Sequence, residues 1–193
     1  MRQSRPVKVK HVQIGGGAPV SIQSMTKTDT ADVGATVAQI EEMVRAGCEI
    51  VRVAVPDNDA AVALKEIRKR VPDVPLVADI HFHYKLALMA LEAGIDKLRL
   101  NPGNIGAHDR IRQVVRAAQA QQVPIRIGVN GGSLEKDLLK KYGTATPEAM
   151  VESALRHVQI LEDLDFTDII ISLKASDVHR TVAAYRLLAE KVD

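Results

Sequence analysis

The sequence predicts an α/β fold of the TIM type, a (β/α)8 barrel of which this chain supplies about six βα units. Six short apolar runs alternate with stretches whose apolar residues recur every three to four positions, which indicates strands and helices in series. Alternate residues within the runs are polar on one side only, whereas a doubly wound sheet has aliphatic residues on both faces. The polar positions gather toward the carboxyl ends of the runs, where barrels place their active sites.

Each predicted strand is a short run of mostly aliphatic residues. The six strands are Ser21 to Met25, Glu49 to Val55, Leu76 to Ile80, Asp96 to Leu100, Ile125 to Val129 and Asp168 to Leu173. The preceding segment, Val7 to Val20, is interpreted as a short entry segment. A closed barrel takes eight units and about 250 residues. We therefore expect residues 1–193 to form a partial barrel domain that binds substrate.

The helices between these strands have recognisable starts and ends. Thr146 before Pro147 and Ser176 before Asp177 are expected N-caps, while Gly47 and Gly94 are expected to end helices. One helix shows its apolar stripe in Ile111, Val114, Val115 and Ala118.

Composition excludes several classes of protein. The chain has 193 residues and a net charge of +2, and only 3% of its residues are aromatic, which argues against a nucleic-acid groove built on stacking. Cys48 is the only cysteine, so the chain has no internal disulfide and lacks the thiolates for an iron-sulfur cluster. We expect Cys48 to be a small buried residue. No apolar run approaches a membrane span, and the start lacks a signal peptide, so we expect a cytoplasmic protein with no membrane partner.

Three predicted strands carry an arginine between aliphatic residues, namely Arg52, Arg99 and Arg126. With Lys174 they place four positive charges at strand ends, opposed by Asp79 alone. Like charges about 4 Å apart repel by roughly 4 kcal/mol at an effective dielectric constant of about 20, so such a cluster requires an anion. One isolated arginine in a strand would most simply form a structural salt bridge. Three arginines in register, together with a lysine, favour a bound diphosphate instead.

The segment from Asp79 to His83 has two histidines on one face of an extended strand, an arrangement that metal-dependent barrel hydrolases use. Further ligands are missing, because His157 and His179 fall in predicted helices. We therefore predict no metal site, and favour Asp79 and His81 as a hydrogen-bonded pair near the substrate, with plain packing as the alternative.

Two turns expose backbone N–H groups beside helix starts, a geometry that binds anions. They are Asn101 to Asn104 and Asn130 to Ser133, so Asn101 and Asn130 join the candidate substrate-binding residues, although either turn could be a plain loop. The run Gly15 to Gly17 lacks the spacing of a nucleotide fingerprint and is interpreted as a turn.

With these residues collected, the chain resembles the barrel domain of the 4-hydroxy-3-methylbut-2-en-1-yl diphosphate synthase family, oxidoreductases of the non-mevalonate isoprenoid pathway. The matching stretches are Ser24 to Thr26, Val51 to Pro56, Ala78 to Phe82, Leu98 to Asn104, Ile127 to Leu134 and Ser172 to Asp177. The resemblance implies reductive opening of 2-C-methyl-D-erythritol 2,4-cyclodiphosphate to 4-hydroxy-3-methylbut-2-enyl diphosphate. It also implies that Asp79 and His81 lie near the carbon skeleton and that the diphosphate is held by Arg52, Arg99, Arg126, Asn130 and Lys174.

The same resemblance implies a 4Fe–4S cluster fed by ferredoxin or flavodoxin. In the family this cluster belongs to a C-terminal domain, which is absent from this sequence, so we expect the fragment alone to be inactive. An incomplete barrel leaves two open strand edges, and the apolar run Ile169 to Ile171 lacks the charges that protect an edge. We therefore expect a homo-oligomer, or an ordered part of a longer protein.

Three alternatives stay open at this point. A metal-dependent barrel hydrolase would use Asp79, His81 and His83. A pterin-binding synthase of similar barrel type could also bind an anionic substrate at polar strand ends. The chain could instead be a non-catalytic phosphate-binding or assembly module.

Overall fold

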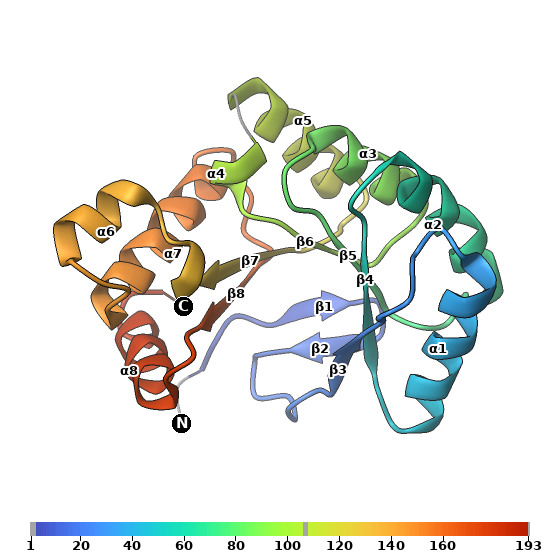
Figure 1. Ribbon diagram of the computed structural model, residues 1–193, viewed down its shortest axis with the longest axis horizontal. Coiled ribbons are helices and arrows are strands. Elements are labelled where there is room, and N and C mark those ends of the chain that lie inside the picture. Colours follow the sequence, from blue (N-terminus) through green and yellow to red (C-terminus); the bar gives the residue numbers. More distant parts are fainter. Residues whose placement is uncertain (1–2, 106–107, 193) are drawn as a thin grey trace.

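The computed structural model describes residues 3–105 and 108–192, and its centre is a curled sheet of parallel strands (Figure 1). Each strand pairs with the next one along the chain, in the order β3-β4-β5-β6-β7-β8. Their bounds are β3 Gln23–Met25, β4 Ile50–Ala54, β5 Leu76–Asp79, β6 Lys97–Arg99, β7 Ile125–Asn130 and β8 Ile169–Lys174. The predicted partial barrel with six strands in series is confirmed.

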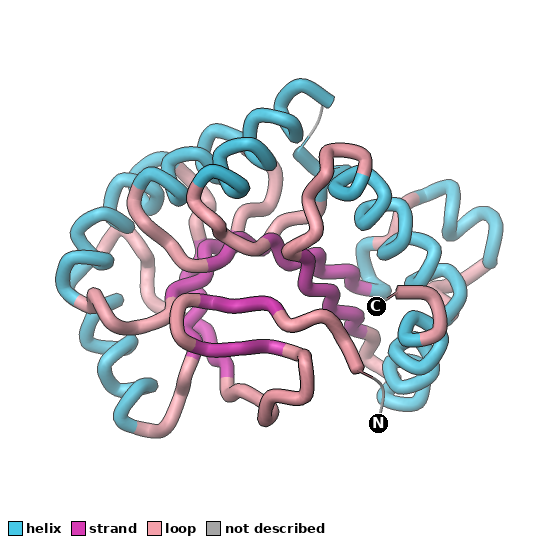
Figure 2. The backbone as a smooth tube through the Cα atoms, turned by 180° about the vertical axis from the view of Figure 1, so that it is seen from behind, coloured by secondary structure: helices cyan, strands magenta, loops and turns pink. Residues whose placement is uncertain are grey.

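Helices form an arc outside the sheet, from α1 at one end to α8 at the other (Figures 1 and 2). They are α1 Val33–Arg45, α2 Asn58–Arg70, α3 Tyr84–Glu92, α4 Pro102–Ile105, α5 His108–Ala120, α6 Lys136–Tyr142, α7 Pro147–Glu162 and α8 Val178–Ala189, with a 3-10 turn η1 at Gly131–Ser133. The four residues predicted for the apolar stripe of α5 are its buried residues. Within the described ranges, no helix has the length and apolar content needed to cross a bilayer.

The predicted helix ends are confirmed at three of four positions. Thr146 caps α7 by accepting a hydrogen bond from the N–H of Ala149, and Gly47 and Gly94 follow helices with φ of 92° and 81°. The prediction for Ser176 is wrong. The N-cap of α8 is Asp177, whose carboxylate accepts from the N–H of Arg180.

The entry segment before the first parallel strand contains a β-hairpin, which the sequence analysis did not specify. Strand β1, Val7–Val9, pairs antiparallel with β2, Val12–Ile14. Val9 is fully buried against Ile50 and Val77, which lie on the inner face of the sheet near its amino end. The hairpin therefore lies across the inner side of the sheet and forms a floor beneath it (Figures 1 and 2).

The register shows which side chains share the inner face. Met25 pairs with Arg52, Asp79 with Arg99, and Arg99 with Arg126, and directly paired residues of parallel strands point to the same side. The alternate residues of these strands pack into the main apolar core with the helices. The polar face predicted from the sequence is therefore the concave one.

Candidate functional site

Asp79 is the centre of the charged cluster on the concave face. One carboxylate oxygen, Oδ2, lies 3.0 Å from Nη2 of Arg52, and the other, Oδ1, lies 3.2 Å from Nη1 of Arg99. The Asp79 side chain is 2% exposed, whereas those of Arg52 and Arg99 are 25% and 20% exposed. One buried carboxylate thus joins β4, β5 and β6, and both guanidinium groups keep an accessible side.

Arg126 adds a third guanidinium without a further carboxylate. It pairs in register with Arg99, and its Nη1 is buried with no hydrogen-bond partner within the part of the chain that the structure describes. Burial lowers the pKa of Arg126 most, followed by the charges of Arg52 and Arg99. A buried N–H group without an acceptor costs free energy, so this corner of the cluster is suited to an anionic ligand.

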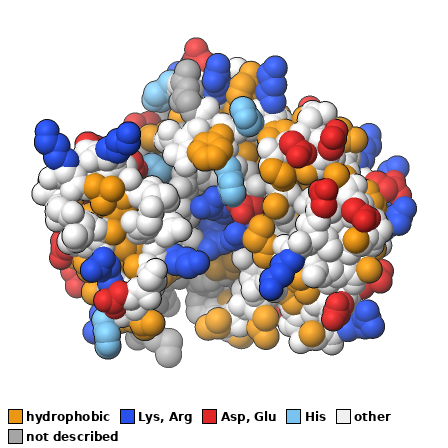
Figure 3. Space-filling view, in the orientation of Figure 1, with side chains coloured by type: hydrophobic (Ala, Val, Ile, Leu, Met, Phe, Trp, Pro, Cys, Tyr) orange, Lys and Arg blue, Asp and Glu red, His pale blue; other side chains and the backbone are white. Residues whose placement is uncertain are grey.

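Figure 3 shows the same feature on the surface. Blue lysine and arginine side chains gather in the hollow between the two sides of the molecule, and pale blue histidines lie above it. The hollow is at the carboxyl ends of the strands, the end where barrel enzymes bind their substrates.

Gly128 of β7 provides the space that Arg99 occupies. A Cβ atom at Gly128 would lie 2.8 Å from Nε of Arg99, and Nη2 of Arg99 donates to the Gly128 carbonyl at 3.3 Å. The position therefore needs glycine for close approach rather than for an unusual backbone angle.

We expect Gly128→Ala to displace the Arg99 guanidinium and to lower the free energy of unfolding by about 1 to 3 kcal/mol, the usual cost of overpacking. Urea denaturation measures the loss. Gly34→Ala is the matched control, because Gly34 lies inside α1, where a Cβ atom would make only an ordinary contact with Oδ1 of Asp32 at 3.6 Å, and alanine there favours the helix. Equal stability of wild type and Gly128→Ala would show that the Arg99 side chain can adopt another conformation at no cost.

The two candidate asparagines are both occupied by hydrogen bonds to the main chain. Nδ2 of Asn101 donates to the Gly128 carbonyl at 2.8 Å and its Oδ1 accepts from the Gly128 N–H at 2.9 Å, so Asn101 ties the end of β6 to β7. Oδ1 of Asn130 accepts from the N–H of Gly132 and caps η1. Asn130 is exposed and pairs in register with the exposed Lys174.

His81 lies at the rim beside the cluster. Its Nε2 is 3.5 Å from Oδ2 of Asp79, and its side chain is 57% exposed. Asp79 and His81 are therefore neighbours without a hydrogen bond between them, and the shorter contacts of Asp79 are those to the two arginines. His83 is exposed, and the described residues contain no cluster of three or more His, Cys, Asp or Glu side chains that could hold a metal ion.

Lys97 is the charged residue of the inner face that sequence reasoning missed. It is only 1% exposed, and its Nζ reaches across the barrel to Oε1 of Gln23 on β3, 3.0 Å away. Burial, then the charge of Arg126, then that of Arg52 lower its pKa to about 7. The available signal was the spacing of two residues to Arg99, which places both side chains on one face of β6.

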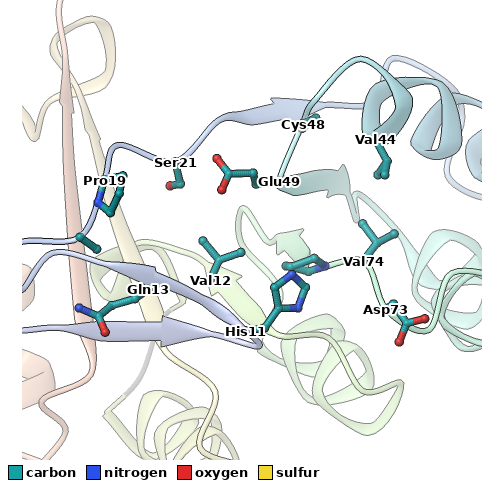
Figure 4. Close-up of a pocket in the computed structure, with 12 residues that line it drawn as sticks. His11, Val12, Gln13, Pro19, Ser21, Val44, Cys48, Glu49, Asp73 and Val74 are labelled. Atoms are coloured by element: carbon teal, nitrogen blue, oxygen red, sulfur yellow. The ribbon is translucent and has the colours of Figure 1, made fainter.

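A separate cavity of about 500 Å³ lies at the opposite end of the strands (Figure 4). Its lining includes His11 and Val12 from the hairpin, Val74, and Cys48 and Glu49 just before β4. Cys48 is buried as predicted, and its thiol donates to the Ile50 carbonyl at 3.1 Å. The only cysteine is thus at the amino ends of the strands, away from the arginine cluster.

Comparison with known proteins gives a family match over nearly the whole chain. Residues 4–193 match the family model described as the GcpE TIM-barrel domain. The chain is 61% identical over 192 residues to a Thermodesulfovibrio yellowstonii protein and 62% identical over 191 residues to a Geobacter sulfurreducens protein, both named 4-hydroxy-3-methylbut-2-en-1-yl diphosphate synthase (flavodoxin). These matches cover 100% and 99% of this chain but 55% and 54% of those proteins. The chain spans about half the length of the curated relatives it matches.

Solved structures show the same architecture at low sequence identity. A dihydropteroate synthase of Xanthomonas albilineans with 4-aminobenzoic acid aligns with a TM-score of 0.61 at 12% identity, over 96% of this chain and 72% of that one. The Plasmodium falciparum HPPK-DHPS aligns with a TM-score of 0.67 at 11% identity, over 97% of this chain and 38% of that one. At these identities the likeness shows the fold alone.

Proposed function

Because this chain belongs to the GcpE TIM-barrel domain family, we propose that its concave face binds the diphosphate of 2-C-methyl-D-erythritol 2,4-cyclodiphosphate. The reaction we propose for the longer protein is the reductive opening of that ring to 4-hydroxy-3-methylbut-2-enyl diphosphate. The relatives that match over about half their length are named for the synthase of this product.

The observation that carries the proposal is Nη1 of Arg126, which is buried without a partner among the described residues, beside two arginines that share one carboxylate. A diphosphate offers several acceptor oxygens and two negative charges, which match these donors in number and sign. In this proposal Arg52, Arg99 and Arg126 contact the diphosphate from one side. Asn130 and Lys174 contact it from β7 and β8, and Asn101 holds the end of β6 in place.

Asp79 and His81 have different proposed tasks. A carboxylate repels phosphate oxygens, so Asp79 orients Arg52 and Arg99 and faces the carbon skeleton rather than the diphosphate. His81 is at the exposed rim within reach of Asp79, where its ring can donate a hydrogen bond to a hydroxyl or bridging oxygen of the substrate.

The electrons for ring opening must come from outside this chain. The names of the relatives support flavodoxin as the donor, and the family implies a 4Fe–4S cluster. The residues present do not fit such a cluster, because the single cysteine lies at the far end of the strands. We therefore propose that the cluster belongs to another domain, and that residues 1–193 bind the substrate without converting it.

Isothermal titration calorimetry with the cyclodiphosphate tests this function. We expect wild type to bind, and Arg126→Ala to bind about 10- to 150-fold more weakly, since a charged hydrogen bond contributes roughly 1.5 to 3 kcal/mol. Arg116→Ala, on the exposed side of α5, is the matched control and should bind like wild type. Equal affinities of wild type and Arg126→Ala would overturn the assignment of the cationic face.

A further inference from the structure

Lys97 is a buried amine that forms no ion pair with a carboxylate of residues 3–105 or 108–192, and it lies two residues before Arg99 on β6. The residue is 1% exposed, and Nζ donates a hydrogen bond to a neutral acceptor, Oε1 of Gln23. The nearby carboxylate of Asp79 is already paired with Arg52 and Arg99.

The charged groups around Lys97 are mostly positive. Arg52 faces it from β4 and Arg126 from β7, and Arg99 is the next inward residue of its own strand, β6. From β5, Val77 pairs directly with Lys97, and the next inward residue of that strand is the acidic Asp79, which pairs with Arg99. Below it, Val9, Val12 and Ile14 of the hairpin make the floor apolar.

We propose that Lys97 takes up one proton from solvent when a diphosphate binds to the arginines above it. In the unliganded barrel, burial and the positive charges of Arg126 and Arg52 disfavour the ammonium form of Lys97. A bound dianion reverses the sign of the local field and makes the ammonium form favourable. The inference rests on the proposed function and adds a positioning residue to it, because Lys97 completes the positive charge under the ligand without touching it.

The lowered pKa of Lys97, about 7, sets the pH at which this coupling is measurable. At about pH 8 the free protein would carry a mostly neutral amine, and binding should draw close to one proton per site. The ligand keeps constant charge, because each of its phosphates has one ester and one anhydride link and a single strongly acidic hydroxyl. Proton uptake therefore reports on the protein.

Calorimetry at about pH 8 in buffers of different ionisation enthalpy counts the protons taken up when the cyclodiphosphate binds. We expect an uptake approaching one proton for wild type and for Lys65→Met, an exposed lysine of α2 that serves as the matched control. Lys97→Met should bind with little or no uptake. Wild-type affinity should also fall by up to about tenfold per pH unit above pH 7, whereas the affinity of Lys97→Met should stay flat.

The possible results separate the two proposals. Binding without proton uptake in wild type, or uptake that persists in Lys97→Met, would overturn the role of Lys97 and leave the diphosphate site standing. No binding by wild type would overturn the proposed function and this inference together. If Lys97→Met does not fold, NMR of wild type labelled at the lysine Cε carbons follows the titration directly. One lysine should titrate near neutral pH without ligand and at a clearly higher pH with ligand.

Discussion

Replacing Asp79 with Asn is expected to lower the free energy of unfolding by about 3 to 5 kcal/mol, the usual loss when one partner of a buried ion pair is removed. The carboxylate is 2% exposed and is the shared acceptor of Arg52 and Arg99. Asparagine keeps the shape and one oxygen but removes the charge, so three arginines and Lys97 would face one another without compensation. Urea denaturation at neutral pH measures the effect.

Inorganic pyrophosphate should restore part of this stability. The anion supplies the negative charge that the variant lacks, so it should raise the unfolding midpoint of Asp79→Asn more than that of wild type. Asp109→Asn is the control, because the Asp109 side chain is 84% exposed in its pair with Arg112 and such pairs contribute at most about 1 kcal/mol. A loss below about 1 kcal/mol in Asp79→Asn would mean that the arginines are solvated rather than held by the carboxylate.

Replacing Lys97 with Met should stabilise the protein at about pH 6.5, by about 1 to 4 kcal/mol, because an unpaired buried charge is exchanged for an apolar side chain of similar length. The folded-state pKa of Lys97 is lowered from 10.5 to about 7, so between these values the unfolded chain binds more protons than the folded one. Wild-type stability attributable to this group therefore rises with pH across that window, by about 1.4 kcal/mol per pH unit.

The difference between variant and wild type should accordingly shrink as the pH rises from 7 to 10. Comparing urea denaturation of the two proteins at several pH values cancels the contributions of other groups, which both share. Lys65→Met again serves as the control, and its difference from wild type should not change with pH. A constant gap between Lys97→Met and wild type would show that Lys97 is charged in the folded protein throughout.

The strands and the inward direction of their arginines could be predicted from sequence, because aliphatic alternation decides both. Lys97 was missed although it obeys the same rule. It follows Asp96 near the start of its strand, and only the tertiary structure shows that this end of the sheet is covered by the hairpin. Burial and the reach to Gln23 depend on residues 74 positions apart, which no local pattern encodes.

The hairpin itself escaped prediction because its strands have three residues each, which is too short for the alternation in Val7-Lys8-Val9 to indicate a strand. The structural role of Asn101 could not be predicted from the sequence either. A turn sequence indicates where a side chain can bind an anion, but both ends of this amide are engaged by the main chain of Gly128, a partner 27 residues away. Whether a polar side chain serves the ligand or the scaffold is decided by such distant partners.

The floor beneath the site also constrains the order in which the chain can be assembled. Successive strands are neighbours, so each new βα unit can dock on the one before it as it is synthesised. The hairpin behaves differently, because Val9 packs with Ile50 and Val77, and Ile170 of the last strand packs against the same cluster. The hairpin is synthesised before β3 to β8, so its packing is complete only once β8 has been made, and until then its apolar side chains lack their full set of neighbours.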